Sequence, residues 1–344
     1  LLMIYSSTRQ KQLSAGLDPM YFLKRQALFL AIGAVAMVAM MVFDYQVLRE
    51  LAPALFCGAV VTLALVLSPL GSESRGIQAW FQIGPYQLQP SEFTKVILII
   101  GLAAYCAANR GDLGGRVLAI ALGLVMIPLA LIYRQPDLGT AMVLAAIIGA
   151  VVLVGGAKGR HLAILCGLAL MVVVVVLQTG KLQDYQMGRL TSFLDPDAGQ
   201  DAAAYNQHQS QVAIAAGGFA GQGLFRGTQT NLSFVPEQHT DFIFTAVGEE
   251  LGFLGSATIL GLFGLMIWRT WRAAALSRDE FGSLVCVGVL AMLVFQVFEN
   301  VGMTMGITPV AGIPLPLMSY GGSSTITTMI AIGLVLNVHM RRLR

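Results

Sequence analysis

Apolar runs long enough to cross a bilayer recur along the whole chain, and this pattern limits the possible folds more than any other feature. A membrane-spanning helix needs roughly 20 mostly apolar residues. Of the 344 residues, 56% are hydrophobic and 11% are charged, whereas about a quarter of the residues in a soluble domain are charged. The sequence therefore predicts an all-α, polytopic membrane protein.

The apolar runs and the residues that interrupt them predict ten transmembrane helices. The chain begins with LLMIY, which we interpret as the tail of a first span, truncated at its start, that ends near Ser7. A long extracytoplasmic loop, residues 179–240, separates spans seven and eight. We expect one integral membrane domain over residues 1–344 that contains this loop. The other nine spans are expected at about 26–43, 51–68, 93–108, 117–133, 138–154, 162–178, 242–268, 281–298 and 323–340.

The loop charges suggest which side of the membrane carries the chemistry. Every loop that follows an even-numbered span is basic, and basic loops favour the cytoplasmic side, although Arg9, Lys11, Lys24 and Arg25 in the first loop argue the other way. Long structureless loops are uncommon unless they are functional. We therefore predict a protein of the bacterial cytoplasmic membrane whose active site faces the extracytoplasmic side. The irregular segments on that side are residues 71–93, 134–140, 179–240 and 300–324.

Ionisable residues gather where span eight begins. The stretch VPEQHTDFIF places Glu237, His239 and Asp241 within five residues, and Glu249 and Glu250 follow roughly 12 Å deeper. Ionisable groups inside a span are costly and indicate function by default, although pairing with a basic residue of another helix would also explain the two glutamates. Asp241 is shallower and accessible to water, which makes it the best candidate for a general base or a metal ligand.

Lys95 and Glu92, in the motif QPSEFTK, lie at the start of span four. Residues three apart on a helix share a face, so the two side chains can form an ion pair. The ammonium group is at the wrong end of the helix for the macrodipole, which leaves an anion-binding lysine as an equal alternative to a structural pair.

Three further charged residues have both a structural and a functional interpretation. Arg134 can cap the end of span five, and Asp137 suits the first turn of span six. A guanidinium beside a helix N-terminus is also a natural phosphate site. Arg189 can contact a lipid phosphate or anchor the loop at the interface.

The glycines between Gly217 and Gly227 have no nucleotide-binding spacing and favour a tightly turning segment at membrane depth.

Several other classes of site find no support. The four cysteines lie in separate apolar runs without zinc-ligand spacing, and one histidine beside one aspartate is not a metal site. A serine hydrolase would show a GxSxG motif, and none occurs.

Five motifs together resemble the SEDS family, the shape, elongation, division and sporulation proteins of bacterial wall synthesis. The GTQ that precedes PEQHTDFIF is closer to the elongation (RodA) branch than to the division (FtsW) branch. Ala204, Ala215 and Ala216 depart from the family pattern within the loop. The motifs are LQPSEFTK (88–95), RQPDLGTA (134–141), RLTSFLDP (189–196), GTQTNLSFVPEQHTDFIFTAVGEELG (227–252) and GITPVAGIPLPLMSYGGSS (306–324).

The resemblance implies a peptidoglycan glycosyltransferase that polymerises lipid II and works in complex with a class B penicillin-binding protein. It also implies that Asp241, the aspartate of the HTDF motif, is the essential residue. The reaction then needs a base for a sugar hydroxyl, or a divalent cation such as Mg²⁺ or Mn²⁺ held by Asp241, and the sequence leaves both roles open. The substrate-binding candidates are Lys95, Glu92, Arg134, Asp137, Arg189, His239 and Glu249.

Two alternatives to the polymerase remain. A lipid II flippase would suit ten spans with buried charges, but it predicts polar residues spread across the membrane, whereas here the acids concentrate on one side. A scaffold without activity would leave Lys95, Glu249 and Glu250 unexplained.

Overall fold

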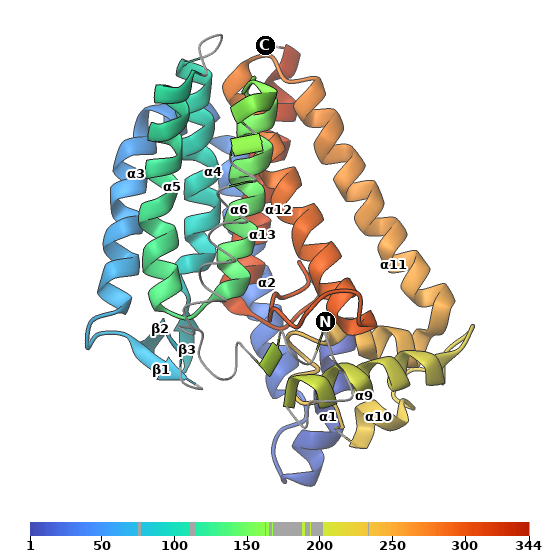
Figure 1. The fold of residues 1–344 in the computed structure, drawn as a ribbon. Helices are drawn as coiled ribbons and strands as arrows, with labels where there is room; N and C mark the ends of the chain where they lie inside the picture. The colour runs from blue at the N-terminus through green and yellow to red at the C-terminus, as the bar shows by residue number, and fades with distance from the viewer. Residues whose placement is uncertain are drawn as a thin grey trace. The chain divides into compact units, whose positions relative to one another are not determined.

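Helices make up most of the structure, a computed structural model that describes residues 1–74, 77–109, 114–161, 163, 164, 167, 188, 189, 193, 202–232 and 234–343 (Figure 1). Seven of the described helices are long and apolar enough to cross a membrane. The helices are α1 (Leu2–Ser14), α2 (Tyr21–Val42), α3 (Tyr45–Val66), α4 (Pro90–Ala108), α5 (Gly115–Arg134), α6 (Leu138–Val154), α9 (Ala202–Gly217), α10 (Thr228–Leu232), α11 (Ile243–Ala275), α12 (Glu280–Met305), α13 (Gly322–Met340) and a 3-10 turn, η1 (Arg341–Leu343).

The predicted spans lie where the long helices lie, but not all ten of them are matched by a long helix. The seven long helices are α2, α3, α4, α5, α11, α12 and α13, and each overlaps a predicted span. The helix α6 begins and ends where predicted, but its 17 residues make it a shorter apolar helix. Most of the predicted span at 162–178 lies outside the described residues. The count of ten spans and the extent of the 179–240 loop therefore remain predictions.

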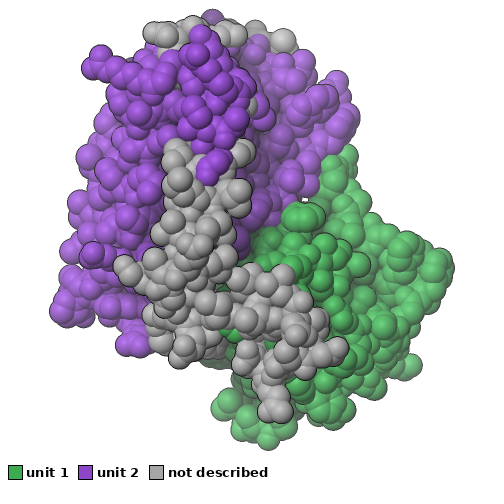
Figure 2. Space-filling model, viewed as in Figure 1, with its two compact units in different colours: residues 1–28, 169–265, 296–321 green, residues 29–168, 266–295, 322–344 purple. Residues whose placement is uncertain are grey.

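The chain forms two compact units, coloured separately in Figure 2. Unit 1 comprises residues 1–28, 169–265 and 296–321, and unit 2 comprises residues 29–168, 266–295 and 322–344. Within unit 2, α4 is the central helix, because it packs against α3, α5, α6 and α13. Most of its apolar stretch is buried, as expected for a helix surrounded by others rather than by lipid.

A small antiparallel sheet occupies much of the segment 71–93, which the sequence analysis treated as an irregular loop. Its strands are β1 (Ser72–Ser74), β2 (Ile77–Ile83) and β3 (Tyr86–Leu88), paired in the order β1-β2-β3. Gly84 opens the two-residue turn between β2 and β3 with a φ of +58°, a conformation that glycine adopts without steric cost. The sheet leads directly into α4 and so sets the entry of the helix that carries Glu92 and Lys95.

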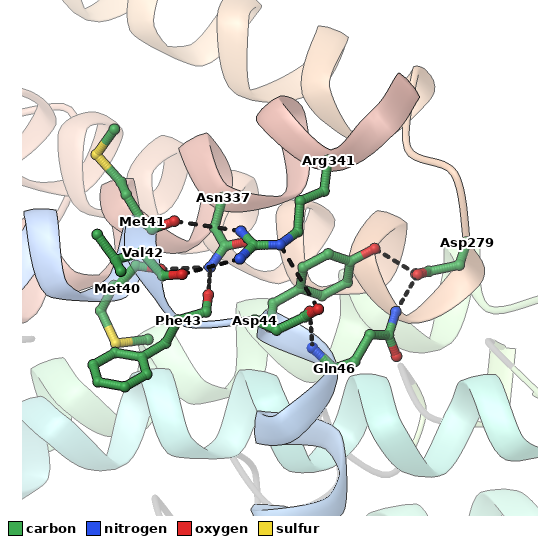
Figure 3. Close-up of polar contacts among 10 residues, drawn as sticks. Met40, Met41, Val42, Phe43, Asp44, Gln46, Asp279, Asn337 and Arg341 are labelled. Carbon is green, nitrogen blue, oxygen red and sulfur yellow. Dashed lines mark hydrogen bonds and ion pairs between the residues drawn. The ribbon is translucent and has the colours of Figure 1, made fainter. Parts of the chain in front are cut away.

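Where α2 ends in unit 2, side chains donate hydrogen bonds to backbone carbonyls (Figure 3). The Asn337 amide donates to the carbonyls of Met40 and Phe43. Arg341 donates to those of Met41 (3.3 Å) and Val42 (3.0 Å). These carbonyls end α2 and have no partner within that helix.

The next helix begins from the same cluster. Asp44 caps α3 by accepting from the Gln46 amide (3.0 Å), and its carboxylate lies 3.8 Å from the Arg341 guanidinium. Tyr45 and Gln46 both donate to Asp279, in the connection between α11 and α12 (Figure 3). Polar groups from four parts of the chain thus hold the α2–α3 connection in one position.

In unit 1, α9 covers the C-terminal end of α12. Gln207, Ser210 and Gln211 lie on one face of α9 and donate to the carbonyls of Met303 (3.1 Å), Thr304 (2.9 Å) and Met305 (3.2 Å) in turn. These last carbonyls of α12 have few partners within the helix, so α9 fixes the point where the loop at 306–321 begins.

The helix α11 is broken at Gly252, where φ is +63° and ψ is −160°. Only glycine adopts this conformation readily. The break leaves backbone groups of α11 without hydrogen-bond partners inside the helix. The glycine-rich segment 217–223 supplies these partners. The amides of Phe253 and Leu254 donate to the carbonyls of Gly218 (2.9 Å) and Phe219 (3.2 Å).

The exchange also runs in the opposite direction. The amides of Gln222 and Gly223 donate to the carbonyls of Glu249 and Glu250, each at 3.0 Å. A Cβ atom on Gly221 would lie 2.2 Å from the Glu250 carbonyl oxygen, so the segment approaches α11 too closely for any side chain there. The tight packing that the glycines indicated is confirmed, whereas the bonds that this segment makes to a broken helix were not predicted.

Replacing Gly252 by alanine is expected to destabilise unit 1 by about 2–5 kcal/mol, because the new Cβ would require both a strained backbone and a shift of the segment at 217–223. Its Cβ would lie 2.3 Å from the Gly221 nitrogen. Gly261→Ala is a matched control on the same helix, because nothing lies within 4 Å of the added Cβ. Thermal unfolding in detergent should show a lower melting temperature for Gly252→Ala alone, and equal melting temperatures would contradict this account.

Candidate functional site

Asp241 lies in a turn just ahead of α11, which begins at Ile243. Asp241 is therefore not part of this helix. Instead, the amides of Thr240 and Asp241 donate to the Glu237 carbonyl at 3.1 and 3.2 Å, and the Thr240 hydroxyl donates to the same carbonyl. This turn, residues 237–241, leaves Asp241 partly exposed. A carboxylate there can reach a substrate as well as water.

Two contacts fix the turn against the loop at 306–321. The Asn300 amide donates to the Asp241 carbonyl (2.7 Å) and to the Ile313 carbonyl (2.8 Å), and thus joins the turn, α12 and the loop. The Tyr320 amide donates to the His239 carbonyl (2.9 Å). Residues on both sides of the turn belong to one buried apolar cluster. Its members are Val235, Phe242, Met303 and Val310.

Arg189 and Asp241 meet at Gly312. A Cβ atom built on Gly312 would lie 3.5 Å from Oδ2 of Asp241 and 3.7 Å from Nη1 of Arg189. Both charged side chains are partly exposed. Gly312 has a φ of +71°, so its backbone also favours glycine. The structure thus brings together two of the residues that the sequence singled out, a carboxylate and a guanidinium. Both lie beside Gly312, which has no side chain.

His239 packs among aromatic rings of the same unit. Its ring centroid lies 4.9 Å from that of Phe22 and 5.7 Å from that of Tyr320, and these two rings meet edge to face at 5.1 Å. Aromatic packing of this kind fixes the orientation of the imidazole. His239 is the middle residue of the turn that carries Asp241, so this packing also holds the turn.

Glu249 is fully buried and bonds to α10. Its carboxylate accepts from the amides of Gln229 (2.7 Å) and Thr230 (3.0 Å) and from the hydroxyls of Thr228 (3.3 Å) and Thr230 (2.6 Å). None of the four contacts of this glutamate is with a basic residue, the alternative that the sequence left open. Its predicted role in substrate binding stays a prediction.

In unit 2, Lys95 and Glu92 form the ion pair that their spacing predicts. Nζ of Lys95 lies 2.7 Å from Oε1 of Glu92, and the side chains are 2% and 6% exposed. A pair this deeply buried is stable only while both partners are present. Of the two interpretations, the structural ion pair is thus confirmed. Anion binding by Lys95 remains a prediction.

Asp137 and Arg134 take the capping positions that the sequence allowed. Asp137 is the N-cap of α6 and accepts from the Thr140 amide (3.0 Å) and hydroxyl (2.7 Å), as well as from Gln89 (3.1 Å) and Ser91 (3.3 Å) at the start of α4. Arg134 is the last residue of α5 and is exposed. Asp137 therefore joins the beginnings of two helices within unit 2.

Asn300 and Gly312 are parts of the Asp241 site that the sequence analysis missed. Asn300 is 0% exposed and lies in α12, in the stretch VFENVG near the end of that apolar helix. An amide inside a membrane helix is costly unless it is hydrogen-bonded, so its presence there was a usable signal. Gly312 had no such signal, because one glycine among the many in that loop does not stand out.

The fold and the charged residues at the ends of its helices define the class of this protein: a multi-pass helical membrane protein with a carboxylate site in the turn before α11. A sequence model of the cell cycle protein family FtsW/RodA/SpoVE matches residues 1–343. The chain belongs to this family, which the SEDS motifs predicted.

Curated relatives from two branches of the family are similar to the chain. It is 34% identical over 98% of its length to the probable peptidoglycan glycosyltransferase FtsW of Trichlorobacter lovleyi, 88% of which is covered. It is 38% identical over 91% of its length to the peptidoglycan glycosyltransferase MrdB of Escherichia coli, 84% of which is covered.

Solved structures share the fold. One, described as the structural coordination of polymerization and crosslinking by a peptidoglycan synthase complex, matches with a TM-score of 0.81 and 36% identity over 94% of this chain and 90% of that one. The rod shape determining protein RodA of Thermus thermophilus matches with a TM-score of 0.70 and 32% identity over 99% of this chain and 96% of that one.

Proposed function

We propose that this chain polymerises lipid II into glycan strands on the extracytoplasmic face of the cytoplasmic membrane, with Asp241 as the general base. The enzyme class is that of its curated relatives: the chain is a peptidoglycan glycosyltransferase. The observation that carries the mechanism is the meeting of Asp241 and Arg189 at Gly312. A base and a cation close together are the two groups that glycosyl transfer from a pyrophosphate requires.

The chemistry divides between these groups. The 4-hydroxyl of the acceptor sugar attacks the anomeric carbon of the donor, and its proton passes to the Asp241 carboxylate. As the new carbon–oxygen bond forms, the bond to the undecaprenyl pyrophosphate breaks, and the pyrophosphate leaves with the electron pair. An α-linked donor and a β-linked product imply a single inverting displacement. Such a step onto a good leaving group needs one base rather than the carboxylate pair of glycoside hydrolysis.

The leaving pyrophosphate needs positive charge, and Arg189 is the proposed source at Asp241. A planar guanidinium can form two parallel hydrogen bonds to phosphate oxygens. Lys95 and Arg134 remain proposed contacts for the same group, as do Glu92, Asp137 and His239 for the rest of the substrate. Lys95 could take this role only by sharing its ammonium group with Glu92, to which it is bonded.

A divalent cation at Asp241 remains a proposal. No group of three or more His, Cys, Asp or Glu side chains that could hold a metal ion occurs among the described residues. Mg²⁺ is often bound through one or two carboxylates plus substrate phosphates and water. A cation here would therefore use Asp241 as one ligand and the pyrophosphate for others, and it would neutralise the leaving group.

The partner and the cellular role follow from the relatives and from one motif. We propose a complex with a class B penicillin-binding protein, because the most similar structure described above comes from a complex that joins polymerization to crosslinking. The GTQ at 227–229 favours the elongation role. The chain should restore rod shape to cells depleted of their elongation SEDS protein and should fail to restore division in cells depleted of the division one. The reverse result would assign it to division.

Polymerisation of labelled lipid II by the purified protein and its partner tests the function. The partner's transpeptidase is blocked with a β-lactam, so that the glycan strands stay uncrosslinked and can be resolved by length. We expect strands to form with this complex and none with the partner alone. Transport of lipid II across vesicle membranes without polymerisation would favour the flippase instead.

A further inference from the structure

Glu249 is a buried carboxylate to which the chemistry above assigns no step. It lies eight residues after Asp241, in the first part of α11 ahead of the break at Gly252, and it is 0% exposed. A buried carboxylate is costly unless its oxygens are hydrogen-bonded. Its partners therefore indicate what it does.

The contacts of Glu249 use the full capacity of a carboxylate. Two oxygens offer about four acceptor positions. Oε1 accepts from the Gln229 amide and the Thr228 hydroxyl, and Oε2 accepts from the Thr230 amide and hydroxyl. All four donors come from α10 and none from the solvent side. No acceptor position remains for a substrate hydroxyl.

These bonds hold the start of α10. The first amides of a helix have no partner within it, and the amides of Gln229 and Thr230 find theirs on Glu249. A negative charge is also favourable at that end of a helix. The approach is close: a Cβ atom on Gly227 would lie 2.7 Å from Oε2 of Glu249, so a side chain there would displace the carboxylate.

Thr230 connects this contact to the turn that carries Asp241. A hydroxyl has one proton, and Thr230 donates it to Oε2 of Glu249 at 2.6 Å. Its oxygen is then oriented to accept from Nε2 of Gln238 at 2.9 Å. Gln238 is 4% exposed and lies within the turn at 237–241. The side chain of Gln238 thus joins the turn to α10, and the side chain of Asn300 joins it to α12.

We propose that Glu249 is a positioning residue for Asp241, acting through Thr230 and Gln238, and does not bind the substrate. The inference rests on the proposed polymerase function for its assay. A carboxylate base must lie within hydrogen-bond reach of the proton it removes, and a displacement of about 1 Å can cost on the order of 100-fold in rate. Loosening the turn should therefore slow the chemical step and leave substrate affinity unchanged.

Steady-state polymerisation of lipid II by the complex with its penicillin-binding partner tests this proposal. Glu249→Gln replaces one acceptor oxygen by an amide that faces N–H or O–H donors. We expect kcat to fall by about 10–100-fold while KM stays within about threefold of that of the wild type. Glu250→Gln is the control at the same depth, because the Glu250 carboxylate bonds to Ser6 and to the backbone of Phe225 and Gly227, ahead of α10, whereas the four donors to Glu249 belong to α10 itself. It should retain kcat.

Variants of Thr230 separate positioning from general stability. Thr230→Ser keeps the hydroxyl and should retain activity, whereas Thr230→Val keeps the shape, loses the hydroxyl and should lose kcat as Glu249→Gln does. The double variant Glu249→Gln/Thr230→Val should be no slower than the slower single variant, because both changes interrupt one connection. A raised KM with unchanged kcat in Glu249→Gln, or full activity in Thr230→Val, would overturn the proposal.

Hydrogen exchange provides a measurement that does not depend on the reaction. The amides of residues 238–242 should exchange faster in Glu249→Gln and Thr230→Val than in the wild type and Glu250→Gln. Unchanged exchange there would refute the connection between Glu249 and the turn. An inactive wild-type complex with these exchange differences intact would instead refute the polymerase function and leave the structural connection standing.

Discussion

Asp241→Asn is expected to abolish glycan polymerisation while the complex with the penicillin-binding partner still forms. A positioned general base typically contributes 10²- to 10⁴-fold, and an amide cannot accept the proton, so the rate should fall by roughly that factor. Asparagine keeps the size of the side chain, and the turn is held by backbone contacts to Glu237 and Asn300. The folded structure should therefore survive. The measurement is the rate of lipid II polymerisation, with complex formation and melting temperature as checks.

Glu237→Gln is the matched control, because it makes the same change of carboxylate to amide in the same turn. The Glu237 carboxylate accepts from the Thr240 hydroxyl at 3.4 Å, a weak contact. This variant should lose at most a few-fold in rate. Equal loss in both variants would mean that the turn, and not the Asp241 carboxylate, had been damaged. Full activity in Asp241→Asn would remove Asp241 from the chemical step.

Chelation separates the two roles left open for Asp241. A general base acts without a metal, so the wild-type rate should survive treatment with a divalent-cation chelator. Loss of activity that returns on addition of Mg²⁺ or Mn²⁺ would assign Asp241 the role of ligand. In that case Asp241→Asn should also weaken the apparent affinity for the added cation.

Lys95→Met is expected to have the largest effect on stability. The substitution leaves the Glu92 carboxylate buried without its partner, and breaking a buried ion pair in this way costs about 3–5 kcal/mol. The pair is separated by 2.7 Å and lies on α4, the central helix of unit 2. Thermal unfolding in detergent should show a much lower melting temperature than that of the wild type.

The double variant Glu92→Gln/Lys95→Met decides what else Lys95 does. It removes both charges, so most of the lost stability should return. If Lys95 also binds the pyrophosphate, polymerisation should stay low even though the protein is folded again. Recovery of both stability and activity would limit Lys95 to its structural role. No recovery of stability would contradict the importance of the ion pair itself.

The sequence was sufficient to predict most of the long helices and to single out two residues, Asp241 and Arg189, that the structure brings together. Hydropathy identified the seven long spans because lipid requires long apolar runs. The spacing of Glu92 and Lys95 predicted their pair because helix geometry is local. The ionisable residues where span eight begins indicated Asp241, and the family motifs then favoured the same residue. Arg189 was a candidate because a guanidinium in that loop can contact a lipid phosphate.

Features that depend on distant partners could not be predicted in this way. The break at Gly252 exists because residues 217–223 supply its hydrogen bonds, and no local pattern reveals that exchange. The sheet at 72–88 replaced an expected loop because β1 and β3 have only three residues each and the seven residues of β2, IQAWFQI, do not alternate between apolar and polar. The contacts of Glu249 could not be predicted either, because the sequence alone does not show that α10 donates to its carboxylate.

The cluster around Arg341 and Asn337 has a consequence for the order in which the protein is completed. Residues that terminate α2 near the start of unit 2 are supplied almost 300 positions later in the sequence (Figure 3). While the ribosome is still synthesising the chain, the carbonyls of Met40 and Val42 have only water as a partner. The hairpin of α2 and α3 therefore enters the membrane before these bonds can form, and they must await α13 and η1. Contacts between such distant residues form slowly, so assembly of unit 2 should finish only after residues 337–341 have been synthesised.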